Sequence, residues 1–145
     1  RIHSLDREEL AKEIEKQAAK HGKVQDCLVE VNMGSEISKG GVAPEAAEDF
    51  VRSLAAYPHI RVKGIMSVLP NLGDTPELDA LYASLYELFQ RVKQIKQPNL
   101  DAVYLSAGMS NDYRVALRHG ANIIRLGRTL FGERVYPAAA ITEQR

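Results

Sequence analysis

The hydrophobic positions of this sequence alternate between short β-branched runs and longer segments with the spacing of an amphipathic helix. In the longest of these segments, 77–96, apolar residues recur every three or four positions: Leu78, Leu81, Leu85, Leu88, Val92 and Ile95. Similar patterns predict helices over 7–21, 44–57 and 112–119, and strands over 27–31, 60–69, 103–105 and 123–126, with a further strand at 2–3. For the first helix, Asp6 is the predicted N-cap and Gly22 the predicted stop.

Strands and helices therefore alternate along the chain, which predicts an α/β fold with a parallel sheet and helical crossovers. Two architectures fit this order: an open doubly wound sheet, or part of a (β/α)8 TIM-type barrel. A complete barrel needs about 250 residues, whereas this chain has 145 residues and up to five predicted strands. The pattern alone does not choose between the two architectures.

Composition and charge narrow the function classes. Lys plus Arg and Asp plus Glu both number 19, and this balance argues against a nucleic-acid-binding or polybasic membrane-surface protein. Apolar residues make up 45% and charged residues 26%, as in ordinary globular domains, and the apolar stretches are too short to span a bilayer. The single cysteine, Cys27, excludes an internal disulfide, and the four histidines lack metal-ligand spacing. We expect a cytoplasmic protein with a small-molecule ligand and without metal, nucleic-acid or membrane partners.

Two loops that follow predicted strands have the composition of phosphate-binding turns. In both architectures the functional edge lies at the C-terminal ends of the strands. The segment 106–111 provides a glycine, two hydroxyl side chains and main-chain N–H groups at a helix N-terminus, where the helix dipole favours an anion. The segment 127–129 provides similar groups and a cation, Arg128. Glycine and serine also occur in strand-to-helix turns that bind nothing, so both a phosphate site and plain turn chemistry fit the pattern.

Arg125 is a charged residue inside an apolar strand. Strand alternation places it on the same face as Ile123 and Gly127, near the functional edge. An arginine in this position needs a partner, which is either a carboxylate in a structural salt bridge or a ligand beside the two loops. Lys39, in the polar loop 32–41, is interpreted as a solvated side chain.

At these residues the chain resembles the pyridoxal phosphate homeostasis family, whose barrel is similar to the N-terminal domain of alanine racemase. The matching segments occur in the family's order and extend to about Tyr136. They are Ile2-His3-Ser4-Leu5-Asp6, Val29-Glu30-Val31-Asn32 with Glu36 and Lys39-Gly40-Gly41, Val62-Lys63-Gly64-Ile65-Met66-Ser67, Leu105-Ser106-Ala107-Gly108-Met109-Ser110-Asn111-Asp112, and Arg125-Leu126-Gly127-Arg128-Thr129-Leu130-Phe131-Gly132.

The resemblance implies a barrel that holds pyridoxal 5'-phosphate across its mouth, formed by residues 1–136 and followed by a tail at 137–145. Arg125 would face the pyridine nitrogen. At position 128 the family more often has a small hydroxyl residue, so the contribution of Arg128 relative to Thr129 is open. The residues implied to line the phosphate are Ser106, Gly108, Met109, Ser110, Gly127, Arg128 and Thr129.

The chain departs from the family in its first strands. The family's Schiff-base lysine and the motifs around it do not occur here, and Lys39 and Lys63 fall at other family positions. The chain therefore resembles only the part from about the fourth strand onward, and we expect a partial barrel with exposed edges and an exposed apolar interior, completed by a missing N-terminal segment or by an oligomer. In such a chain, phosphate or sulfate could occupy the site instead of the cofactor.

Three functions remain open. The leading expectation is a non-catalytic carrier or regulator of intracellular pyridoxal phosphate. The enzyme alternative is an amino-acid (alanine) racemase, which this chain resembles less because it has no room for the second, β-rich domain of alanine racemases. The third is a truncated α/β fragment with a weak phosphate site only.

Overall fold

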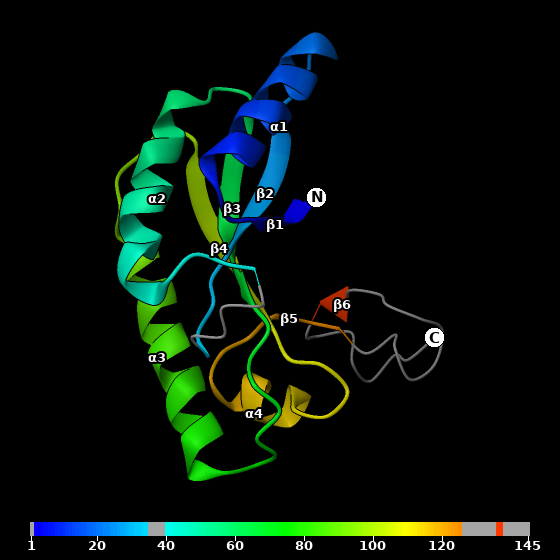
Figure 1. Ribbon diagram of the computed structural model, residues 1–145, viewed down its shortest axis with the longest axis vertical. Helices are drawn as coiled ribbons and strands as arrows, with labels where there is room; N and C mark the ends of the chain where they lie inside the picture. The colour runs from blue at the N-terminus through cyan, green and yellow to red at the C-terminus, as the bar shows by residue number, and fades with distance from the viewer. Residues whose placement is uncertain (1, 35–39, 126–135, 138–145) are drawn as a thin grey trace.

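The computed structural model describes residues 2–34, 40–125 and 136–137. Strands and helices alternate as the sequence predicts (Figure 1). The elements are β1 (Ile2–Leu5), α1 (Glu8–Lys20), β2 (Gln25–Glu30), α2 (Ala47–Ser53), β3 (Ile60–Ser67), α3 (Pro76–Lys93), β4 (Leu100–Ala107), α4 (Tyr113–Arg118), β5 (Ile123–Ile124) and β6 (Tyr136–Pro137), with short 3₁₀ turns at Pro44–Ala46 and Leu54–Ala56 flanking α2.

The order of the strands decides between the two predicted architectures. The sheet has the order β1-β2-β3-β4-β5-β6, and β1 to β5 are parallel. A doubly wound sheet reverses its order at a switch point, and this sheet does not. The fold is therefore a partial (β/α) barrel, in which each unit lies beside the next. The sequence did not predict β6, which pairs antiparallel with β5.

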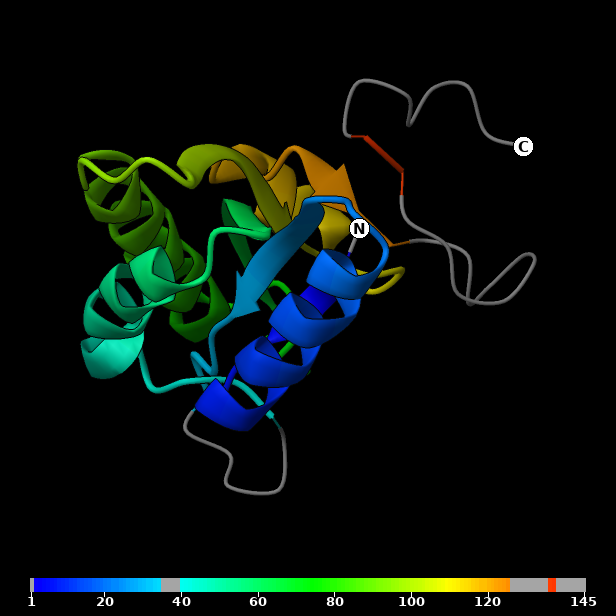
Figure 2. The ribbon, with the colours of Figure 1, turned by 90° about the horizontal axis from the view of Figure 1, so that it is seen from above.

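The helices cover one face of the sheet, and the core lies between them and the strands. Seen from above, α1, α2 and α3 form an arc around the strands (Figure 2). Large side chains from both layers are fully buried there, including Ile60, Ile65, Leu85, Leu88 and Leu105. None of the described helices is long and apolar enough to cross a membrane.

The opposite face of the sheet is charged near the N-terminal ends of the strands. Arg61 and Lys63 alternate with buried Val62 and so point away from the helices. Lys63 Nζ lies 2.5 Å from Asp101 Oδ2, and Arg61 Nη1 lies 3.9 Å from Asp26 Oδ1. Among the described residues, the exposed large hydrophobic side chains are Val24, Leu72, Tyr86 and Val103. These ion pairs occupy part of the face that was expected to be apolar. Val103 alternates with buried Ala102 on β4 and so lies on the same face as Asp101, which makes this part of the interior partly charged and partly apolar.

Strands β3 and β4 approach each other unusually closely at Gly64. This residue has φ +150°, and a Cβ added to it would lie 1.8 Å from the carbonyl oxygen of Tyr104. The pairing register of β3 shifts between Val62 and Gly64, which marks a local irregularity in the ladder. Only glycine fits here, because any side chain would overlap the backbone of β4.

Asp6 does not cap the first helix, contrary to the sequence-based prediction. The N-cap of α1 is Arg7, and no side chain accepts a hydrogen bond there. Asp6 Oδ2 instead accepts the main-chain N–H of Gly41 at 2.9 Å, because the chain that leaves β2 returns beside the end of β1. The predicted stop was correct: α1 ends at Lys20, and Gly22 follows with φ +63°.

Cys27 is a buried core residue, and its thiol is expected to be inert in the folded chain. Its exposed fraction is 0%, and burial raises the pKa of the thiol to about 12, with a smaller contribution from Asp26. Because the thiolate is the reactive species, alkylation of the native chain with iodoacetamide at pH 8 should be at least about a hundredfold slower than alkylation in guanidinium chloride. Mass spectrometry at timed intervals measures both rates, and equal rates would contradict the buried position of β2.

Candidate functional site

Polar side chains from neighbouring strands meet at the C-terminal edge of the sheet. Glu30 of β2 pairs with Met66 of β3, Met66 pairs with Ser106 of β4, and Ser106 pairs with Ile123 of β5. Arg125 follows two residues after Ile123 and so lies on the same face of the strand. The register therefore places Glu30, Ser106 and Arg125 on one face of the sheet, at its functional edge.

The turn from β4 to α4 is held against β5 at Gly108. The carbonyl oxygen of Gly108 accepts the main-chain N–H of Arg125 at 2.9 Å. Gly108 has φ +101°, and a Cβ added to it would lie 2.8 Å from the Cβ of Ala116. Glycine therefore allows the turn to pack closely on α4 while it lies beside Arg125.

At this edge, polar atoms of two residues are buried without a hydrogen-bond partner in the part of the chain that the structure describes. Two polar residues in the described chain are buried, Ser67 and Ser106, both with an exposed fraction of 0%. The Ser67 hydroxyl donates to the carbonyl oxygen of Val31 at 2.6 Å. By contrast, Ser106 Oγ and the Nε and Nη2 atoms of Arg125 lack hydrogen-bond partners among the described residues. Buried polar atoms are nearly always paired, and an unpaired group is a feature of ligand sites.

The main-chain N–H of Met109 is already occupied. It donates to Asp112 Oδ1 at 2.7 Å, and the hydroxyl of Tyr82 donates to Asp112 Oδ2 at 2.7 Å. Met109 is one of the residues that the family resemblance predicts to line the phosphate. In this conformation the Met109 amide donates to the Asp112 carboxylate instead. Met109 therefore contributes to the site through the shape of the turn and not through its own N–H group.

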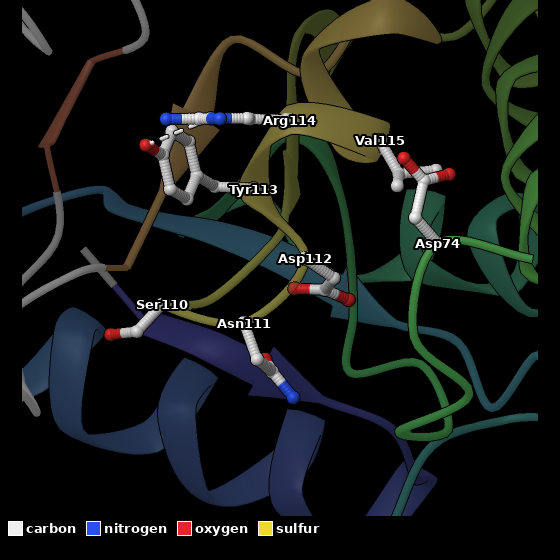
Figure 3. Close-up of a pocket in the computed structure, with 7 residues that line it drawn as sticks. All are labelled: Asp74, Ser110, Asn111, Asp112, Tyr113, Arg114 and Val115. Atoms are coloured by element: carbon white, nitrogen blue, oxygen red, sulfur yellow. Dashed lines mark hydrogen bonds between the residues drawn. The ribbon is translucent and has the colours of Figure 1, made fainter.

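A pocket of about 370 Å³ opens beside the same turn (Figure 3). It lies between the β4–α4 turn and the loop before α3, which contributes Asp74. Arg114 lies over the ring of Tyr113, with its Cζ atom 5.5 Å from the ring centroid. Asn111 Nδ2 donates to Asn71 Oδ1 at 2.7 Å. Ser110, an exposed residue, also lines this pocket.

Two carboxylates adjoin the edge on the side of β1 and β2. A Cβ added to Gly40 would lie 3.0 Å from Asp6 Oδ2 and 3.7 Å from Glu30 Oε1, which places both acids beside this glycine. Burial raises the pKa of Glu30, the negative charge of Asp6 raises it further, and the positive charge of Arg125 opposes both. The edge thus combines an arginine with two acids, and the described contacts of Arg125 do not include an ion pair with either.

The structure brings together part of the predicted site. Ser106, Gly108, Met109, Ser110 and Arg125 lie on adjacent strand ends, as the sequence predicts. Gly127, Arg128, Thr129 and Lys39 fall outside the described residues. Lys63 pairs with Asp101 on the charged face near the N-terminal ends of the strands, away from this edge. Tyr82 was not predicted as part of the site, because its position in the apolar stripe of α3 gives no sign that its hydroxyl reaches Asp112.

Comparisons with known proteins agree with this architecture. The sequence profile of the family described as "Alanine racemase, N-terminal domain" matches residues 2–135. The pyridoxal phosphate homeostasis protein of Aquifex aeolicus is 42% identical over 135 residues, which are 93% of this chain and 58% of that protein. The protein of the same name from Vibrio cholerae is 34% identical over 93% of this chain and 56% of its own length.

Solved structures of related proteins have the same fold as this chain. PipY of Synechococcus elongatus, solved with PLP bound, is 30% identical with a TM-score of 0.75, over 90% of this chain and 60% of that one. A protein of unknown function from Bifidobacterium adolescentis is 27% identical with a TM-score of 0.83, over 90% of this chain and 52% of that one. The chain thus spans somewhat more than half the length of the proteins it matches.

Proposed function

Because the chain belongs to the family of the alanine racemase N-terminal domain, we propose that it binds pyridoxal 5'-phosphate and acts as a non-catalytic carrier or regulator in the homeostasis of this cofactor. Its curated relatives are named pyridoxal phosphate homeostasis proteins, and the PipY structure contains PLP. The observation that carries the proposal is that Ser106 Oγ and the Nε and Nη2 atoms of Arg125 are buried on one face of adjacent strands without hydrogen-bond partners among the described residues.

These groups fit the two ends of the cofactor. In the proposed pose Ser106 and the turn from Gly108 to Ser110 bind the phosphate, together with Gly127, Arg128 and Thr129. The guanidinium of Arg125 donates a hydrogen bond to the pyridine nitrogen, and this bond gives one of its unpartnered nitrogens an acceptor. Since arginine remains charged at all ordinary pH values, it disfavours protonation of that nitrogen. The bound cofactor supplies electron-sink chemistry, and an unprotonated ring is a weaker sink than one paired with an acid.

Replacing Ser106 with alanine tests the phosphate end of this pose. Because Ser106 Oγ has no hydrogen-bond partner within the described ranges, Ser106→Ala should leave the free energy of unfolding nearly unchanged and weaken PLP binding about fivefold. Isothermal titration calorimetry with PLP, with pyridoxal and with inorganic phosphate measures the change, and pyridoxal affinity should stay constant.

The matched control is Ser67→Ala, which removes the hydrogen bond to Val31. It should lower the free energy of unfolding by about 1 kcal/mol and leave the PLP affinity unchanged. If the unmodified chain bound PLP no more tightly than inorganic phosphate, the chain would be a phosphate-binding fragment and the cofactor proposal would be wrong.

A racemase is the second candidate, because the family profile is that of alanine racemase. Incubation of the chain with PLP and L-alanine, followed by chiral chromatography, separates the two functions. A carrier leaves the D-alanine yield at the level that free PLP produces, whereas an enzyme raises it above that level.

A further inference from the structure

Tyr82 connects helix α3 to both ends of the short helix α4. The hydroxyl of Tyr82 donates to Asp112, the N-cap of α4, and the ring of Tyr82 stacks on His119, the C-cap, at a centroid distance of 6.3 Å. The exposed fraction of Tyr82 is 1%. Burial raises the pKa of this phenol, and the nearby Asp112 carboxylate raises it further, so the phenol remains a proton donor.

Asp112, the hydrogen-bond partner of Tyr82, also bonds to Met109 in the turn before α4. Its carboxylate does not bond to the first amides of its own helix; it accepts the Met109 N–H at 2.7 Å, while its main-chain N–H donates to the Met109 carbonyl oxygen at 3.2 Å. These two bonds close a ring that fixes the backbone between Gly108 and Asp112. The carboxylate of Asp112 is partly buried, and its second oxygen accepts the hydrogen bond from the fully buried Tyr82 hydroxyl, which would otherwise lack a partner.

The turn fixed in this way leads directly into the proposed phosphate site. Its first residues follow Ser106, and its Gly108 carbonyl oxygen accepts the N–H of Arg125. Its shape therefore sets the distance between the serine hydroxyl, the guanidinium and the amides that follow Met109. A shift of about 1 Å in such a constellation is enough to weaken binding.

We propose that Tyr82 and Asp112 are positioning residues that hold the β4–α4 turn in the shape that receives the phosphate group of the cofactor. This inference rests on the proposed function. Neither side chain contacts the ligand; both act through the main chain of Met109.

Conservative substitutions test the proposal. Tyr82→Phe removes one hydrogen bond without changing the size of the ring, and it should weaken PLP binding about fivefold while pyridoxal binding stays the same. Asp112→Ala should weaken PLP binding more, by about tenfold or beyond, whereas Asp112→Asn keeps an oxygen for the Met109 N–H and should stay within about twofold of the unmodified chain. The control is Tyr86→Phe, at a partly exposed tyrosine one turn along α3, which should change neither affinity.

A second measurement is independent of the ligand. In the ligand-free chain, hydrogen exchange of the Met109 amide, followed by NMR, should accelerate about tenfold or more in Asp112→Ala and remain slow in Asp112→Asn. An unchanged exchange rate in Asp112→Ala would overturn the proposal, because the amide would then not depend on this carboxylate.

The outcomes separate this inference from the function on which it rests. If Ser106→Ala weakens PLP binding and Tyr82→Phe lowers only the thermal stability, the cofactor site stands and Tyr82 is merely structural. If PLP and pyridoxal bind the unmodified chain equally, both proposals are wrong, because no phosphate contribution exists for the turn to provide.

Discussion

Gly64→Ala is expected to lower the free energy of unfolding by about 4 kcal/mol or more, which is enough to prevent folding of a domain of this size. The added Cβ would lie 1.8 Å from the Tyr104 carbonyl oxygen and 2.7 Å from its carbonyl carbon. Both atoms belong to the backbone of β4, so no rotamer change relieves the overlap. The φ of +150° adds strain for any residue with a side chain.

Gly73→Ala is the matched control. Gly73 also has a positive φ, +67°, but a Cβ added there meets nothing within 4 Å. This variant should lose about 1 kcal/mol. Urea unfolding followed by circular dichroism measures both changes. If the two variants were equally stable, β3 and β4 could not approach as closely as the structure shows.

Arg125→Met is expected to change stability and binding in opposite directions. Nε and Nη2 of Arg125 are buried without partners in the described chain. Methionine fills a similar space without polar groups, so the ligand-free chain should gain about 1 kcal/mol. If Arg125 donates to the pyridine nitrogen, the same variant should bind PLP about tenfold more weakly, because a hydrogen bond from a charged donor is lost.

Arg125→Lys separates the charge of this residue from its shape. Lysine keeps the positive charge but presents a single ammonium on a flexible stem, so PLP affinity should fall between those of the unmodified chain and Arg125→Met. Thermal unfolding without ligand and calorimetry with PLP provide the two readouts. A loss of stability in Arg125→Met with unchanged PLP affinity would identify Arg125 as a structural residue.

The secondary structure followed from the sequence because its signals are local. The apolar stripe from Leu78 to Val92 predicts α3, and the positive φ of Gly22 agrees with the predicted end of α1. Strand order was not predictable in this way, because β3 and β4 pair through a contact between Gly64 and Tyr104 that periodicity does not encode. The Asp6 cap was wrong for a similar reason: its partner, Gly41, lies far along the chain.

In the candidate site too, features set by local residue types were predictable, and features set by contacts between distant residues were not. Ser106, Gly108 and Arg125 were identified from their own residue types and their positions in strands and turns. The Tyr82–Asp112 hydrogen bond joins residues 30 positions apart, so the occupation of the Met109 amide could not be inferred from the turn sequence alone.

The consecutive pairing of β1 to β5 has a consequence for how this chain acquires its structure. Each strand pairs with the next along the chain, but every parallel pair is joined by a crossover that contains a helix, so a long loop must close before each pair forms. The sheet is therefore expected to form more slowly than a helical bundle of the same length. The edge where Arg125 and Ser106 meet exists only once β5, a strand of two residues, has paired with β4, so ligand-binding competence should depend on the shortest parallel pair of the sheet.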